Sequence, residues 1–183
     1  MKKTIYTTIL ICIFSLTAHS QITEGNWMVG GSGSYIHRTI DTGVGNSKNS
    51  RLTIKPNVGY FIKDKFVFGS SLSYYQYKSL TGFNSYTKNY GIGLFSRYYF
   101  LKSEKIINIF SQVHFDKDFY ENNAGSVNKG DGYRYGLKVG QVIFFNSSVG
   151  LEFSVGYEKI ITGQDYFEDI VVGIGFQIHL EKK

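Results

Sequence analysis

Apolar and polar residues alternate along the final stretch of the chain, from residue 169 to residue 180. A two-residue period is typical of a β-strand with one apolar and one polar face. At roughly 3.3 Å per residue the stretch can cross the apolar core of a membrane when tilted, because a transmembrane strand needs about 9 to 11 residues. The apolar face of this strand carries Ile170, Val172, Ile174, Phe176, Ile178 and Leu180.

The same alternation recurs along the preceding chain. The faces opposite the apolar ones are rich in glycine and serine, which suit the narrow lumen of an eight-stranded barrel better than an exposed strand surface. The pattern predicts an all-β chain that forms an eight-stranded antiparallel up-and-down transmembrane β-barrel. The expected strands span residues 26–35, 52–62, 66–74, 89–100, 107–116, 133–143, 149–158 and 169–180.

The segments between these strands alternate in length. Long polar segments at 37–50, 78–87, 118–131 and 161–168 alternate with short turns at 63–65, 102–104 and 146–148. Bacterial outer-membrane barrels have short periplasmic turns and longer extracellular loops. The alternation therefore predicts periplasmic termini and places the segments 43–49 and 122–130 outside the cell.

Two alternatives bear on this prediction. In a soluble eight-stranded barrel or sandwich the apolar face would be the core, but the strands are longer than is usual in globular proteins and their other face lacks the charges expected there.

Pro56 has no N–H for a strand ladder, so we interpret it as a local bulge, the alternative being a strand that begins after it.

The beginning of the chain differs from the rest. Lys2 and Lys3 precede an apolar run at 9–16 and then Ala18-His19-Ser20, an order typical of a secretory signal. The apolar run is shorter than the ~20 residues of a spanning helix. We expect a cleaved signal peptide at 1–20 and an outer-membrane β-barrel at 21–183. Cys12, the single cysteine, lies in this segment, so no disulfide is expected in the mature chain.

Composition supports a β-rich membrane protein and argues against a nucleic-acid partner. Aromatic residues make up 17% of the chain and charged residues 19%, below the globular norm of about a quarter. Without Lys2 and Lys3, 18 basic residues face 14 acidic ones, an excess too small to indicate nucleic-acid binding. Aromatic residues also recur at the strand ends, as in the interfacial girdles of membrane barrels.

The run P-N-V-G-Y-F-I-K-D-K-F-V-F-G at 56–69, the R-Y-Y-F at 97–100 and the closing strand resemble the small outer-membrane β-barrel domain family, which is OmpA/OmpX-like in architecture. The resemblance covers nearly the whole mature chain. It implies location in the outer membrane of a Gram-negative bacterium, contact with outer-membrane lipids including lipopolysaccharide, and assembly by barrel-insertion machinery that reads the last strand. Leu180 is followed by Glu181-Lys182-Lys183, whereas the family usually ends on an aromatic residue.

Few residues are candidates for catalysis or for binding a metal or cofactor. His37, His114 and His179 lack metal-ligand spacing, and no motif supplies a catalytic His-Ser-acid set. The G-x-G phrases lack the helix that a dinucleotide site requires. We therefore expect no catalytic residue, no metal site and no cofactor. A lipid-modifying barrel enzyme is a remote alternative.

Charged residues on the expected lumen faces form one candidate site. Arg97 and Glu152 each lie a few residues from a short turn, so they should point inward at similar depth, with Lys138 and Lys55 higher up. Their side chains are long enough to meet across so narrow an interior. If they pair, the lumen is plugged. If each is independently hydrated, the barrel is a narrow channel for small solutes or ions.

Basic residues of the expected outer loops form a second candidate site. Cations there can contact anionic lipopolysaccharide head groups, and a merely solvated rim is the alternative. These residues are Arg38, Lys48, Arg51, Lys78, Lys88, Lys117 and Lys129. The sequence thus predicts a non-enzymatic barrel that has an envelope-structural role or binds an unknown extracellular ligand through its loops.

Overall fold

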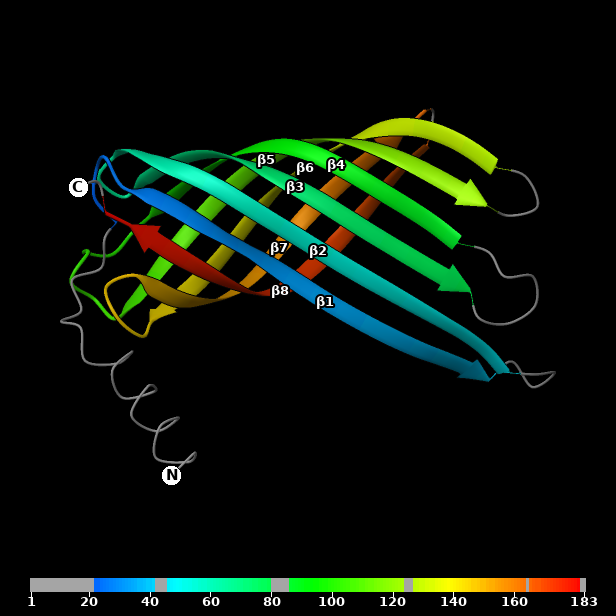
Figure 1. The fold of residues 1–183 in the computed structure, drawn as a ribbon, viewed down its shortest axis with the longest axis horizontal. Helices are drawn as coiled ribbons and strands as arrows, with labels where there is room; N and C mark the ends of the chain where they lie inside the picture. The colour runs from blue at the N-terminus through cyan, green and yellow to red at the C-terminus, as the bar shows by residue number, and fades with distance from the viewer. Residues whose placement is uncertain (1–21, 42–45, 80–85, 124–126, 164, 182–183) are drawn as a thin grey trace, which may run out of the picture.

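The computed structural model describes residues 22–41, 46–79, 86–123, 127–163 and 165–181, which form a closed antiparallel barrel (Figure 1). The expected signal segment at 1–20 lies outside the described residues. Each strand pairs with the next, and the last pairs with the first. Among the described residues, no helix is long and apolar enough to cross a membrane. The strands are β1 (Trp27–Asp41), β2 (Asn46–Lys63), β3 (Phe66–Ser79), β4 (Tyr86–Tyr99), β5 (Ile107–Asn123), β6 (Val127–Phe144), β7 (Val149–Thr162) and β8 (Asp165–Leu180).

The predicted faces are confirmed. On β8, Phe176 and Ile178 point outward and are exposed, whereas Gln177 and His179, which alternate with them, are buried in the lumen. The same alternation holds on β4, where Leu94 is exposed and its neighbour Phe95 is buried. The barrel therefore carries an apolar outer wall around a lumen that contains both polar and apolar side chains.

The predicted long loops, and the alternation of long loops with short turns, are wrong: the connection 100–106, at the end of the barrel near the termini, is longer than any connection at the other end. β1 continues to Asp41 and β2 begins at Asn46, so only residues 42–45 separate them. The ladder between β5 and β6 likewise continues to Asn123 and Val127. Beyond a membrane both faces of a strand can be polar, so the apolar alternation that reveals a strand is lost there although backbone pairing continues.

Pro56 lies inside β2, opposite Gly31 of β1. Pairing between β2 and β3 is interrupted after Ile54 and resumes at Asn57 in the same register. The interpretation of Pro56 as a bulge is therefore wrong, because a bulge would change the register. The register does shift further along β2, between Phe61 and Lys63.

The seam between β1 and β8 is shorter than the other strand pairings. It runs from Trp27 opposite Leu180 to Ser32 opposite Gly175. Beyond that point each strand stays paired only with its other neighbour, β1 with β2 and β8 with β7. In Figure 1, β1 and β8 are adjacent near the C-terminus and diverge toward the opposite end of the barrel.

Candidate functional site: a plugged terminal half and an open outer half of the lumen

Arg97 lies at the centre of a buried network in the half of the lumen nearest the chain termini. Its Nη1 atom is 2.8 Å from Glu152 Oε2, and its Nε donates to Gln112 Oε1 at 2.8 Å. Lys138 Nζ is 3.0 Å from the other carboxylate oxygen of Glu152. Only 2% of Arg97 is exposed. The structure thus brings Arg97, Glu152 and Lys138 together at one depth.

Two uncharged residues that the sequence analysis did not single out complete this network. The Tyr99 hydroxyl donates to Gln177 Oε1 at 2.5 Å, and Arg97 Nη1 lies 3.2 Å from the Tyr99 oxygen. The guanidinium also lies 4.1 Å from the centre of the Phe110 ring, within cation–π range. The alternation along β4 and β8 could have identified both residues, because Tyr99 lies on the same inward face as Arg97, and Gln177 lies on the same inward face as His179.

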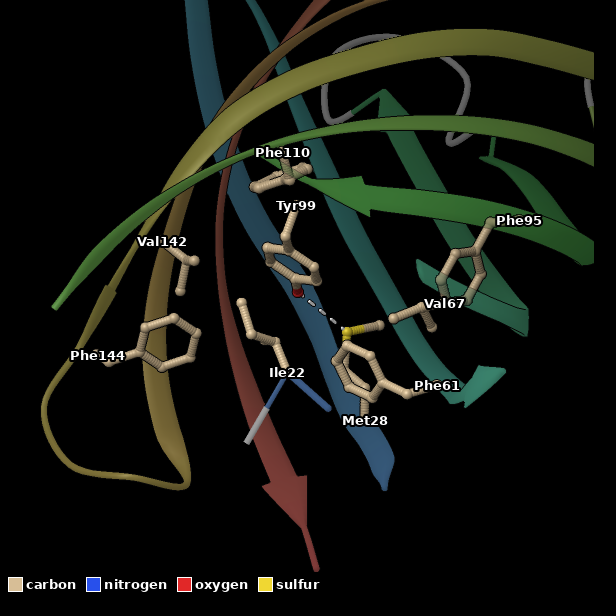
Figure 2. Packing of buried hydrophobic residues seen from close by; sticks show 9 residues of the cluster. All are labelled: Ile22, Met28, Phe61, Val67, Phe95, Tyr99, Phe110, Val142 and Phe144. Carbon is tan, nitrogen blue, oxygen red and sulfur yellow. Dashed lines mark hydrogen bonds between the residues drawn. The ribbon is translucent and has the colours of Figure 1, made fainter. Parts of the chain in front are cut away.

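An apolar cluster seals the same end of the barrel. Met28, Phe61 and Phe110 are fully buried there, and the Tyr99 hydroxyl lies 3.4 Å from the Met28 sulfur (Figure 2). Ile22, which precedes β1, is fully buried in the same cluster, and its carbonyl accepts a hydrogen bond from the Lys65 N–H at 3.0 Å. We call the Arg97 network and this cluster the plug. The complete cluster contains Ile22, Met28, Phe61, Val67, Phe95, Tyr99, Phe110, Val142 and Phe144.

A second set of charges lies farther from the termini. Lys55 Nζ pairs with Glu158 Oε1 at 3.1 Å, so the structure places Lys55 apart from Glu152. Arg134 Nη2 lies 2.6 Å from Asp118 Oδ2. His114 Nε2 is 3.6 Å from Glu158 and 3.8 Å from Asp116, too far for a strong hydrogen bond. The predicted lumen cluster is therefore two clusters, and Lys55 belongs to the outer one.

This outer cluster lines a cavity of about 880 Å³, which we call the outer cavity. Several buried polar atoms on its wall have no hydrogen-bond partner among the described residues: Asn57 Oδ1, Tyr75 Oη, His114 Nε2 and Arg134 Nε. Buried polar groups in proteins are normally hydrogen-bonded. The wall can therefore give hydrogen bonds to, and accept them from, water or a ligand.

The structure does not bring His114 and His179 together. His179 lies in the plug and His114 in the outer cavity, whereas the side chain of His37 lies outside the described part of the chain. Among the residues that the structure describes, no group of histidine, cysteine or acidic side chains has the arrangement of a metal site.

The basic residues assigned to outer loops lie in strands. Arg51 lines the mouth of the outer cavity, Lys117 pairs with Asp131, and Lys129 Nζ lies 3.7 Å from Glu121. The strand positions of all seven are Arg38 (β1), Lys48 and Arg51 (β2), Lys78 (β3), Lys88 (β4), Lys117 (β5) and Lys129 (β6). The side chains of Arg38 and Lys48 lie outside the described residues. Carboxylate partners thus neutralise part of this rim.

Comparison with solved structures shows the fold. Neisserial surface protein A matches with a TM-score of 0.58 and 17% identity, over 85% of this chain and 97% of that one. The outer-membrane protein OprG of Pseudomonas aeruginosa matches with a TM-score of 0.54 and 12% identity, over 92% and 100% of the two chains. No protein-family model and no curated protein matches. As its sequence pattern predicts, this chain has the fold of the small eight-stranded outer-membrane β-barrels.

Proposed function

We propose that this protein is an integral outer-membrane barrel that neither conducts through its lumen nor catalyses a reaction, and that it acts through its outer end. The plug is the observation that carries this proposal. Large side chains and paired charges fill the lumen at one depth, and eight strands leave an interior only just wide enough for side chains. An ion could pass only by displacing them.

The outer wall supports membrane placement. Leu94, Val113 and Leu137 are each about half exposed, and a soluble monomer rarely exposes a continuous apolar surface of this kind. Aromatic pairs bound this apolar band. The ring centroids of Tyr74 and Tyr90 lie 5.2 Å apart at one edge. Those of Trp27 and Tyr60 lie 5.1 Å apart at the other edge, as in interfacial girdles.

The strand extensions beyond Tyr74 and Tyr90 form the outer end. Lys78 and Lys88 point outward from this rim, whereas Lys117 and Lys129 have carboxylate partners. Lys159 of β7 also has a carboxylate partner, since its Nζ lies 3.4 Å from Glu168 Oε1. We propose that the rim contacts lipopolysaccharide or an external partner, with Lys78 and Lys88 as the cations available to phosphate groups.

Planar-bilayer recording tests the central claim. Purified wild-type barrel, whose insertion is verified by heat-dependent electrophoretic mobility, should show no steady conductance steps. Reproducible ion-selective steps would support the narrow channel instead. Lipid analysis of a deletion strain tests the enzymatic alternative, since an altered acyl or head-group profile that the wild-type gene restores would contradict a non-catalytic role.

Surface labelling tests the orientation. Epitope tags inserted within 42–45 and within 124–126 should be stained on intact cells, because these residues join strands at the end away from the termini. A tag at 146–148 serves as the control and should be stained only after the envelope is opened. The reverse result would place the plug, rather than the outer cavity, on the outside.

A further inference from the structure

The short seam leaves a gap in the barrel wall. Pairing between β1 and β8 ends at Ser32 and Gly175, yet β1 continues to Asp41 and β8 begins at Asp165. Added Cβ atoms confirm the gap. One at Gly175, inside the seam, would lie 2.7 Å from the Gly31 carbonyl oxygen of β1, whereas among the described residues one at Gly173 would meet only Ser154 Oγ of β7, at 3.0 Å. We call the space between these unpaired segments the lateral opening.

The lateral opening lies at the level of the apolar band. Ile170 and Val172 point outward on the unpaired part of β8 and are 81% and 80% exposed, whereas Phe176 on the paired part is 58% exposed. Ile170 lies opposite Tyr157, one of the aromatic residues at the outer edge of the band. The opening therefore faces the outer part of the hydrocarbon layer rather than the external solution.

Unpaired strand edges are unfavourable in hydrocarbon. Each unsatisfied backbone group costs several kcal/mol there, and irregular backbone is tolerated where it lines a polar or water-filled cavity. The outer cavity meets this condition, because its lining includes Gly33 of β1 and Gly173 of β8, one on each edge of the lateral opening. The cavity therefore reaches the lateral opening from the lumen side.

The two ends of this cavity differ in chemistry. The lumen wall offers hydrogen-bonding atoms of Tyr75, His114 and Arg134. Its main cations, Lys55 and Arg134, already have the carboxylates of Glu158 and Asp118, so the wall favours hydrogen bonding over binding of a net charge. The cavity volume of about 880 Å³ is within the roughly 300 to 1,000 Å³ range of small-molecule sites.

We propose that the lateral opening admits a single-chain amphiphile with an uncharged, hydroxylated head group from the outer leaflet. The head group binds at Asn57, His114 and Arg134 on the cavity wall, and the alkyl chain passes between Gly33 and Gly173 to lie along Ile170 and Val172. We expect a diacyl phospholipid to be excluded, because Ile170 and Val172 of β8 offer an apolar edge for one alkyl chain. This inference deepens the proposed function and rests on it only for membrane placement.

Tryptophan quenching tests the proposal, because Trp27 is the single tryptophan of the chain. In a Trp27→Phe background, Tyr75→Trp places a reporter in the outer cavity, and Tyr74→Trp places a matched reporter on the outer wall. Both variants are inserted into phosphatidylcholine vesicles that contain either a monoacylglycerol brominated on its chain or a phosphatidylcholine brominated at the same carbon.

We expect the brominated monoacylglycerol to quench both reporters and the brominated phosphatidylcholine to quench only the Tyr74→Trp variant. Absence of quenching in the Tyr75→Trp variant by the monoacylglycerol overturns the proposal, and this is also the result expected if a second copy of the chain seals the opening. Failure of the phospholipid to quench the Tyr74→Trp variant would instead contradict membrane placement, so the two failures are distinguishable.

A second pair of variants tests the route. Gly173→Phe, added to the Tyr75→Trp reporter, places a ring on the lumen side of the lateral opening, where Ser154 Oγ is the one atom of the described residues within 4 Å of the added Cβ. Val172→Phe adds a ring on the lipid side of the same strand. The first should abolish quenching by the monoacylglycerol and the second should leave it unchanged. Equal quenching in both variants, or equal loss in both, overturns lateral entry.

Discussion

In the terminal half of the lumen, Arg97, Glu152 and Tyr99 are held among large apolar side chains, and most of their polar atoms have protein partners. In the outer half, Lys55 and Arg134 are also paired, but glycine, serine and asparagine line the wall around a cavity. The two halves share the same strands and the same inward positions. Side-chain size therefore helps to decide whether a lumen of this diameter becomes a core or a vestibule.

Breaking the charge network of the plug should have the largest effect. Glu152→Gln leaves Arg97 and Lys138 without their carboxylate, and loss of one partner of a buried pair typically costs about 3 to 5 kcal/mol. Adding Arg97→Met should recover part of the lost free energy of unfolding, which urea titration in lipid vesicles measures. Strictly additive effects of the two changes would show that the charges are independently hydrated.

A charge on the outer wall should have the next largest effect. Leu94→Lys puts an ammonium on the lipid face near mid-depth and should cost roughly 2 to 4 kcal/mol, whereas Thr53→Lys in the outer cavity should cost less. From sequence alone, Ile174 and Gln177 would be the natural pair for this comparison. The structure rules them out, because Ile174 borders the lateral opening and Gln177 belongs to the plug. Equal losses at Leu94 and Thr53 in the same urea assay would contradict the assignment of faces.

Removing a charge from the outer cavity should have the smallest effect. About a quarter of the Lys55 side chain is exposed, and Glu158 keeps Arg134 as a second cation, 3.8 Å away. Lys55→Met should therefore change the free energy of unfolding by about 1 kcal/mol or less, as for a solvated ion pair. A loss as large as that of Glu152→Gln would show that the outer half is as tightly organised as the plug.

The sequence predicts the fold because alternation on one lipid-facing wall is a strong signal in every strand. It also predicts the meeting of Arg97 and Glu152, since both lie near short turns and register then fixes their depth. It does not separate Lys55 from this pair, because depth depends on strand tilt as well as on position along the strand. Ile22 was also missed, since a single apolar residue before a strand has no periodicity that would place it.

The short seam could not be predicted for a related reason. Beyond Gly175, β8 keeps a strand-like alternation as far as Ile170, whereas β1 loses it after Tyr35, and nothing in either segment specifies whether the other is its neighbour. Pairing of the first and last strands depends on how all eight strands close. It is therefore a property of the whole barrel.

The continuation of the ladders past the aromatic girdle also bears on how an antibody or a phage receptor-binding protein would meet this surface. Flexible loops lose conformational entropy when they are bound, whereas β5 and β6 remain paired as far as Asn123 and Val127. The entropic cost of ordering such a stiff ribbon on binding is small, so a partner can reach useful affinity with a small buried interface area. Sequence change on these hairpins would then alter recognition through individual side chains and leave the backbone epitope in place.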